Sequence, residues 1–215
     1  MQYPDYSDYT IKWATLPWEV EQAHALRRRV FCDEQGLFAG DDADATDGHA
    51  RTLVALGNHG GWHQQVVGTV RIHREGPADE NLWYGSRLAV DPAFRTQGQL
   101  GSTLIKLAVS SAHALGCQTF MATVQIQNEP LFKRLNWRTH DYRDIQGLKH
   151  AVMQADLAAY PPCFTPTSGF VLKARKQHIH EHFWPGLLDA EQAQPLAQSA
   201  NLNLARVPGE LKTAV

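Results

Sequence analysis

The chain has 215 residues, 43% of them hydrophobic, which predicts one domain with an ordinary buried core and an extension. Its formal net charge of −2 argues against a protein drawn by overall charge to nucleic acid or to a membrane surface. The sequence contains no run of about 18 apolar residues, so no membrane-spanning helix is expected. The first residues, MQYPDYSDYT, lack the basic and apolar regions of a signal peptide. Three cysteines without metal or redox spacing fit a reducing compartment, so we expect a cytoplasmic protein with no metal, nucleic-acid or membrane partner.

The N-terminal part of the chain alternates strand and helix patterns. Residues 9–15 (YTIKWAT) are rich in β-branched and aromatic residues and predict a strand. Apolar residues then recur at three- and four-residue steps up to Phe31 and predict an amphipathic helix that begins near Pro17. Residues 51–56 and 65–74 predict a hairpin, and residues 83–90 predict the strand that follows it.

An acidic loop, residues 31–49, separates the predicted first helix from the hairpin. Its carboxylates are Glu34, Asp41, Asp42, Asp44 and Asp47. They could face a cationic substrate, or they could only solvate the loop, and the sequence leaves both open. Their spacing lacks the central glycine and final glutamate of a calcium loop, so calcium is not expected.

Residues 82–104 (LWYGSRLAVDPAFRTQGQLGSTL) predict a strand, a glycine-bearing loop and the start of a helix over 102–115. A helix start presents backbone N–H groups without intrahelical partners, and Gly98 and Gly101 let an anion approach the backbone. Arg95 adds a positive charge. A phosphate is the favoured ligand, although many strand-to-helix loops have this pattern for structural reasons.

The second half continues with a strand over 119–126, a short helix over 128–135 and a segment, residues 148–157, that fits a strand or a helix. A proline-rich break follows Tyr160. We expect one domain over residues 1–158 and a C-terminal extension over 159–215 that serves as a docking or dimer arm, with a homodimer as one expected assembly. In the extension, residues 169–184 fit a further strand, on which His178, His180 and His182 would share a face; surface histidines are favoured over a zinc or nickel site.

Several motifs in order resemble the GNAT superfamily of acyl-CoA-dependent N-acyltransferases, over roughly residues 9–157. SRLAVDPAFRTQGQLGSTLIKLA (86–108) resembles the superfamily's strand and pyrophosphate loop. Asn128, Leu131-Phe132 and Leu135-Asn136-Trp137 resemble its second cofactor motif. LRRRVFCDEQG (26–36) and GLKHAVM (147–153) resemble one subgroup, and the chain is also similar to GNAT proteins encoded beside nitrilase-type gene clusters. The resemblance implies an α/β (α+β) fold with a mixed, mostly antiparallel central sheet, splayed between strands 4 and 5 and flanked by helices.

The resemblance also implies acetyl-CoA as co-substrate, with its pantetheine in the gap between these strands and its pyrophosphate at the helix start. An amine would attack the thioester directly, and a backbone N–H near Val90 could stabilise the oxyanion. The implied cofactor-binding residues are Leu88, Ala89, Val90, Arg95, Thr96, Gln97, Gly98, Gln99, Leu100, Gly101, Ser102, Asn128 and Phe132.

The chain departs from the family pattern at three places. Two residues separate Gly98 from Gly101, where the family usually has one. Phe132 replaces the Tyr that usually protonates the leaving thiolate. Tyr84 stands where a catalytic Glu often lies. The remaining catalytic candidates are Glu34, as a base through water, and Tyr84 or Tyr142, as an acid. Candidate substrate-binding residues are Arg29, Phe31, Asp47 and His150. A purely structural role stays open for the catalytic candidates.

The function favoured by the sequence is transfer of an acetyl group from acetyl-CoA to the amine of a small molecule, with a cationic acceptor suiting the acidic loop. One alternative is an acyltransferase similar to acyl-homoserine-lactone synthases, which share the R-x-x-V-F helix, although their tryptophan spacing is not evident. Another is a non-catalytic acyl-CoA-binding or scaffolding module.

Overall fold

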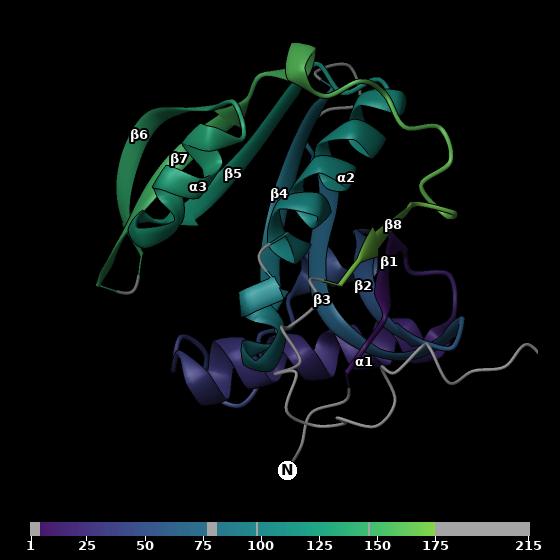
Figure 1. Ribbon diagram of the computed structural model, residues 1–215. Coiled ribbons are helices and arrows are strands. Elements are labelled where there is room, and N and C mark those ends of the chain that lie inside the picture. Colours follow the sequence, from purple (N-terminus) through teal and green to yellow (C-terminus); the bar gives the residue numbers. More distant parts are fainter. Residues whose placement is uncertain (1–4, 77–80, 98, 146, 175–215) are drawn as a thin grey trace, which may run out of the picture. The chain divides into compact units, whose positions relative to one another are not determined.

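The computed structural model describes residues 5–76, 81–97, 99–145 and 147–174. Within them, one eight-stranded sheet has the order β6-β7-β5-β4-β3-β2-β1-β8, and three α-helices flank it (Figure 1). The helices are α1 (Pro17–Arg28), α2 (Leu100–Ala114) and α3 (Glu129–Arg134). The strands are β1 (Asp8–Trp13), β2 (Arg51–His59), β3 (Trp62–Glu75), β4 (Leu82–Val90), β5 (Thr119–Gln125), β6 (Trp137–Ile145), β7 (Leu148–Ala155) and β8 (Phe170–Lys173).

The predicted fold class is confirmed, because β4 and β5 form the parallel pair in a sheet whose other pairs are antiparallel. The strand alternative for the segment after residue 148 is also the one observed, as β7. Among the described residues, no helix has both the length and the apolar character that a membrane span requires.

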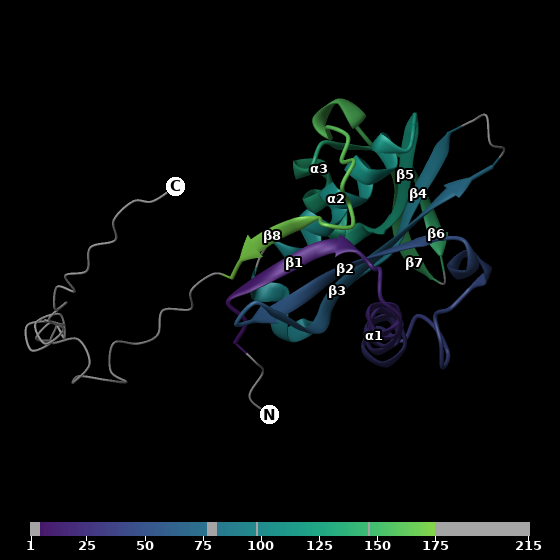
Figure 2. The same cartoon turned by 90° about the vertical axis from the view of Figure 1, so that its right-hand side faces the viewer.

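The sheet is buried on both faces because its central strands alternate between two apolar clusters. Leu53 and Ala55 of β2 pack with α2 in one cluster, whereas Val54 and Leu56 pack with α1 in the other. Since successive side chains of a strand point to opposite faces, α1 and α2 cover opposite sides of the sheet, as the view in Figure 2 shows. The two helices thereby hold the central strands from both sides.

The parallel pairing of β4 with β5 is short. It runs only from Leu82 to Gly85, opposite Thr119 to Ala122. Beyond this point β4 continues beside β3 as far as Val90, while β5 continues beside β7, and the two strands diverge (Figure 1). Gly85 sits at the divergence, where a Cβ would lie 3.0 Å from the Phe120 ring. The splay implied by the sequence resemblance is therefore present.

Helix α1 does not stop at Arg28 but widens into a π-helical turn, Arg29–Glu34. This turn lies beside the splayed part of the sheet and brings Phe31 and Glu34 towards it. After the end of β4, a 3₁₀ turn, Pro92–Gln97, leads towards α2. The chain thus places two irregular segments at the point where β4 loses its partner.

The sheet extends past the domain boundary expected at residue 158. Tyr160 is buried, accepts a hydrogen bond from Trp137 Nε1 at 3.0 Å and donates one to the Leu135 carbonyl. Strand β8 then pairs antiparallel with β1. Residues 159–174, which we expected to belong to the extension, therefore pack on the first domain. Residues 175–215, with His178, His180 and His182, lie outside the described residues.

A substitution at Gly169 tests whether β8 docks on β1. Gly169 has φ +63°, and a Cβ there would lie 1.9 Å from the Ile11 carbonyl oxygen. Gly116 has φ +85°, and a Cβ added to it would meet nothing within 4 Å, so it is a matched control. Each substitution to Ala costs about 1–2 kcal/mol for the left-handed backbone. We expect Gly169→Ala to lose roughly 1–3 kcal/mol more because of the clash, measured by urea unfolding. Equal losses would contradict the docking of β8.

Candidate active site

Two adjoining cavities lie at the splay. The first, named here the loop cavity, has a volume of about 660 Å³ and lies between the π-helical turn, the end of β4 and the start of α2. The second, the sheet cavity, has a volume of about 380 Å³ and is lined by residues from both apolar clusters, so it passes between β4 and β5. The two share Gln35, Leu37, Leu88, Gln125, Asn128 and Phe132 and are therefore contiguous.

Most of the predicted cofactor-binding residues line the loop cavity. They are Leu88, Ala89, Val90, Arg95, Leu100, Gly101, Ser102, Asn128 and Phe132. Thr96 and Gln99 lie outside this lining, and neither Gly98 nor the side chain of Gln97 belongs to the described part of the chain. The fold therefore brings together residues of β4, of the turn after it, of α2 and of the segment that leads into α3.

Helix α2 begins at Leu100, two residues earlier than predicted. Its first helical hydrogen bond runs from Thr103 N–H to the Gln99 carbonyl at 2.8 Å, and Gln99 provides no side-chain cap. The N–H groups of Leu100, Gly101 and Ser102 therefore have no intrahelical acceptor, and all three residues border the loop cavity. Such a helix start, with its positive dipole end, suits an anion.

Arg95 does not point freely at this helix start. Its guanidinium donates two hydrogen bonds to Glu34, at 2.6 and 2.7 Å, and one from Nε to the Val90 carbonyl at 3.0 Å. The hydrogen bonds from Arg95 lower the pKa of Glu34, which makes Glu34 a weaker base. Glu34 lines the loop cavity and is absent from the described lining of the sheet cavity. The pair ties the π-helical turn to the loop before α2.

The acidic loop is neutralised by three arginines. Arg27, almost fully buried, binds Asp42 at 2.8 Å and Asp47 at 2.6 Å. Arg71 binds Asp44 through two nitrogens, at 2.7 and 2.8 Å, and also lies 2.8 Å from Asp47. Arg87 completes the network with contacts of 2.9 Å to Asp42 and 3.1 Å to Asp44. Asp42, Asp44 and Asp47 are thus held by arginines, which argues against their facing a cationic acceptor.

The network also shifts the acidities of its carboxylates. Hydrogen bonds from Arg71 lower the pKa of Asp44 to about 2 from its ordinary 3.8. Burial alone would raise the pKa of Asp47, but hydrogen bonds from Arg27 and Arg71 outweigh it, so the pKa falls. Asp47, predicted to bind substrate, is therefore held as a carboxylate by two arginines.

This arrangement predicts an acid-dependent stability. Because the folded pKa of Asp44 is below the unfolded value, its contribution is complete above about pH 4 and is lost as the pH falls towards 2. We expect Asp44→Asn to lower stability at neutral pH and to reduce the loss between pH 4 and 2, measured by urea unfolding. Asp33→Asn, at an exposed position of the same segment, should keep the wild-type slope. An unchanged slope in Asp44→Asn would contradict the network.

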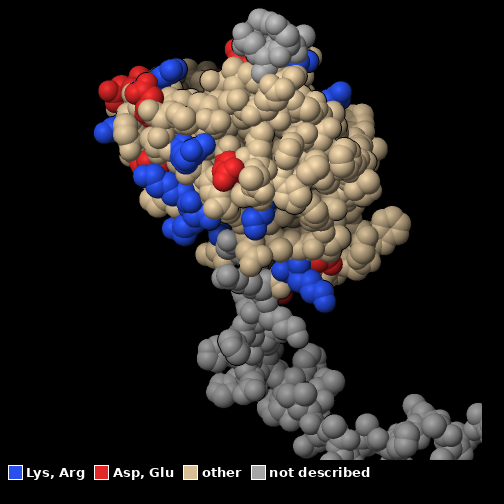
Figure 3. Space-filling view, turned by 90° about the horizontal axis from the view of Figure 1, so that it is seen from above, with Lys and Arg blue, Asp and Glu red and all other residues tan. Residues whose placement is uncertain are grey.

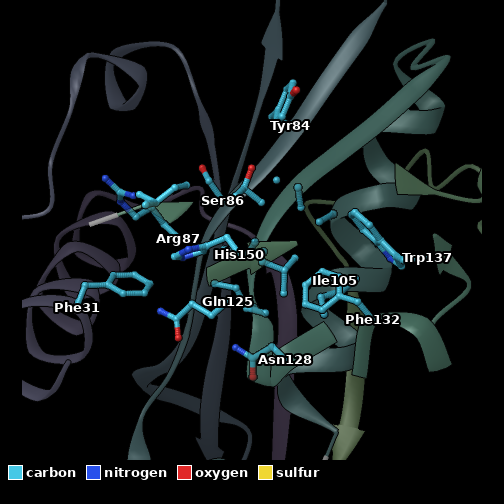
Figure 4. Close-up of a pocket in the computed structure, with 18 of the residues that line it drawn as sticks. Phe31, Tyr84, Ser86, Arg87, Ile105, Gln125, Asn128, Phe132, Trp137 and His150 are labelled. Carbon is cyan, nitrogen blue, oxygen red and sulfur yellow. The ribbon is translucent and has the colours of Figure 1, made fainter. Parts of the chain in front are cut away.

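The sheet cavity has two sides, one apolar and one where Arg87 lies beside aromatic rings. Figure 4 shows Ile105, Phe132 and Trp137 on one side and Phe31 and Arg87 on the other, with His150 and Gln125 between them. Its described lining contains no Asp, Glu or Lys, and Arg87 is its permanently charged residue. Because Asp42 and Asp44 balance that charge, the cavity is close to neutral.

His150 is one of the polar residues that line the sheet cavity. The residue is 9% exposed, and its Nδ1 lies 2.8 Å from the Leu148 carbonyl oxygen. Since a carbonyl oxygen can only accept, Nδ1 carries a proton, and in the neutral imidazole Nε2 therefore keeps the lone pair. The ring lies within the cavity between its two sides (Figure 4). His150, expected to face the acceptor, thus lies in the lining of the sheet cavity.

The other predicted residues divide between the cavity and its surroundings. Tyr84 lines the sheet cavity, and its ring stacks on His73 with centroids 6.1 Å apart. Phe31 lines it too. Tyr142 instead donates to Glu129 Oε1 at 3.1 Å, and Arg29 pairs with Asp91 at 2.9 Å; neither is in the described lining of either cavity.

Sequence reasoning missed Arg87 and His73 as cavity residues. Arg87 has φ +54°, beside a register shift between β3 and β4, and nothing in the sequence announces an irregular backbone there. His73 pairs with Tyr84 across the two strands. Burial lowers the pKa of His73, and its Nδ1 has no hydrogen-bond partner. Residues 65–74 alternate so that Arg71 and His73 share one face of the strand. That alternation is the sequence feature that could have indicated His73.

Charged side chains on the outer surface form no network like that of the acidic loop on the face seen in Figure 3. Figure 3 shows one face on which basic and acidic side chains lie mainly towards the margins, while most of the face carries neither. Among the residues that the structure describes, no group of three or more His, Cys, Asp or Glu side chains could hold a metal ion. The two cavities are therefore the features of the described domain that call for a ligand.

Comparisons with known proteins agree with this geometry. The family model for the acetyltransferase (GNAT) family matches residues 8–136, which is more than half of the chain. Solved structures of similar fold include a candidate N-acetyltransferase from Lactobacillus plantarum (21% identity, TM-score 0.59, covering 68% of this chain and 97% of that one). A second is Escherichia coli ElaA (17% identity, TM-score 0.56, covering 69% of this chain and 98% of that one). A third is FeeM, an N-acyl amino acid synthase from uncultured soil microbes (14% identity, TM-score 0.56, covering 71% of this chain and 93% of that one). No curated protein sequence matched. The chain belongs to the GNAT acetyltransferase family.

Proposed function

We propose that the protein transfers an acetyl group from acetyl-CoA to the amine of a small molecule by direct attack on the thioester. The observation that carries the proposal is the continuity of the two cavities at the splay. One offers an anion site at a helix start, and the other offers a sheltered space with a proton acceptor. We also propose that it acts in the cytoplasm, which its three free cysteines support.

The backbone provides most of the proposed cofactor contacts. From Ser86 to Val90, β4 has no strand partner on its β5 side, so its backbone groups on that edge can pair with the pantetheine amides like an added strand. The N–H groups of Leu100, Gly101 and Ser102 would bind the pyrophosphate. Asn128 borders both cavities and would orient the pantetheine between them.

His150 would accept the proton in the transfer step. The acceptor's nitrogen forms a bond to the acyl carbon, the thioester C–S bond breaks, and the sulfur leaves as thiolate. The proton lost by nitrogen goes to Nε2 of His150. A backbone N–H near Val90 would stabilise the developing oxyanion. Tyr84 is the candidate acid that lines this cavity, whereas Glu34 and Tyr142 are not in its described lining.

Gly101→Asp tests the anion site. A carboxylate in the first turn favours helix stability, so the variant should fold, but it should repel the pyrophosphate. By calorimetry we expect micromolar or tighter acetyl-CoA binding by the wild type and a loss of at least tenfold in Gly101→Asp. Gly101→Ala should bind nearly as well as the wild type, because its Cβ would meet only Val90, at 3.8 Å. No wild-type binding at high micromolar concentration would sink the proposal.

His150→Gln tests the proton acceptor. General base help is worth about 10²–10⁴-fold, so we expect kcat to fall by that factor in a thiol-release assay with the best amine of a broad panel. Acetyl-CoA affinity should stay unchanged. His140→Gln, at an exposed position of β6, is the control and should behave like the wild type. An unaltered kcat in His150→Gln would rule out this role.

The absence of the usual Tyr at Phe132, together with the engaged state of Glu34, supports a second candidate, a non-catalytic acyl-CoA-binding module. The same two assays separate the candidates. Tight acetyl-CoA binding with no thiol release across the amine panel would favour the binding module over the enzyme.

A further inference from the structure

Arg87 uses only part of its guanidinium for contacts within the described domain. Its Nη2 donates to the Asp42 carbonyl at 2.9 Å and to Asp44 Oδ2 at 3.1 Å, and its Nε lies 2.9 Å from Asp42 Oδ2. No described residue accepts a hydrogen bond from Nη1, and Nη1 is not among the buried atoms that lack a partner. The two N–H groups of Nη1 are therefore open to a ligand.

The head group of Arg87, and not only its stem, lies at the sheet cavity. Its central carbon is 4.4 Å from the ring centroid of Phe38 and 6.0 Å from that of Phe31, and both rings line the cavity. Figure 4 shows Phe31 and Arg87 on the same side. The Arg87 side chain is 18% exposed, against 1% for Arg27 and 4% for Arg71. Of the three arginines in the network, Arg87 is thus the one that a ligand can reach.

The network compensates the charge of Arg87 less well than it compensates the other two arginines. Burial would lower the pKa of Arg27 and of Arg71, but hydrogen bonds to their aspartates outweigh it and raise the pKa of both. At Arg87, burial and the nearby charge of Arg71 lower the pKa, and the attraction of Asp42 and Asp44 does not make up for them. A further negative charge beside Arg87 would therefore be favourable.

A second hydrogen-bond donor lies next to Arg87 on β4. Ser86 also lines the sheet cavity, and its Oγ accepts a hydrogen bond from Arg71 Nε at 2.9 Å. No described residue accepts from the Ser86 hydroxyl, so its O–H can donate to a ligand. The irregular backbone at Arg87, with φ +54° beside a register shift, breaks the alternation of the strand, and such irregularities re-aim side chains. Figure 4 shows the two residues beside each other.

We infer that Arg87 Nη1 and the Ser86 hydroxyl bind a carboxylate of the acceptor, so that the acceptor is an amino acid. The inference rests on the proposed function, because the amine of the same molecule must reach the thioester. A carboxylate has one charge and two acceptor oxygens, which match one guanidinium nitrogen and one hydroxyl. The described lining of the cavity contains no Asp or Glu that could bind a cationic acceptor instead. The transfer chemistry is unchanged, with His150 taking the proton.

A panel of matched acceptors tests the inference with the wild-type protein and acetyl-CoA. Each standard amino acid is compared with its amide and with the amine that lacks the carboxylate, and phosphoethanolamine represents an aminoalkyl phosphate. Thiol release gives kcat/KM, which is corrected for the unprotonated fraction of each amine. Because hydrogen bonds between charged groups are strong, we expect the best amino acid to exceed its amide by about tenfold to a hundredfold.

Three results of this panel would count against the inference. An amide or simple amine used as well as its amino acid would overturn the inference and leave the proposed function standing. Phosphoethanolamine used better than the best amino acid would do the same, because the anion would then be a phosphate. No thiol release with any member of the panel would overturn both.

Variants connect the selectivity to Arg87. Arg87→Gln keeps a polar side chain beside Asp42 but removes the charge, so the ratio of amino acid to amide should fall by about tenfold or more. Loss of folded protein lowers both rates alike and leaves the ratio unchanged. Ser86→Ala keeps the charge and should lower the ratio by a smaller factor. Arg28→Gln, at an exposed position of α1 outside both cavity linings, is the control and should keep the wild-type ratio. A wild-type ratio in both Arg87→Gln and Ser86→Ala would contradict the carboxylate site.

Discussion

The β4–β5 pairing ends at Gly85, and the rest of the site depends on that short pairing. If the two strands stayed together to Val90, their backbone groups would satisfy each other and side chains would close the gap. Because they part, β4 keeps a free backbone edge, and the space between the strands joins the α1 side of the sheet to the α2–α3 side. The irregular backbone at Arg87 lies on the same stretch of β4.

Ion pairs hold the walls of this opening in place. The three arginines and three aspartates of the acidic loop network fasten the loop to β3, β4 and α1. Arg95 and Glu34 join the π-helical turn to the loop before α2. Since these charges largely compensate one another, the proposed ligand recognition rests on backbone N–H groups, on His150, on apolar surface and, for the acceptor, on Arg87.

The sequence predicted the parts of the site that depend on local pattern. The strand, glycine loop and helix over 82–115 appear in the expected order, and Asn128 and Phe132 reach the same cavity as Val90. Partners distant in sequence could not be predicted, because spacing does not reveal that Asp44 binds Arg71 or that Glu34 binds Arg95. The boundary at 158 was misplaced for a similar reason. The proline-rich segment looks like a linker, but Tyr160 and β8 find buried partners in the domain.

The most direct test of the proposed site is a crystal structure with a non-hydrolysable acetyl-CoA analogue. We predict the pyrophosphate at the N–H groups of Leu100 to Ser102 and the pantetheine along β4 from Ser86 to Val90. The thioester mimic should lie within reach of His150 Nε2. An analogue bound elsewhere, with the gap between β4 and β5 empty, would contradict this placement.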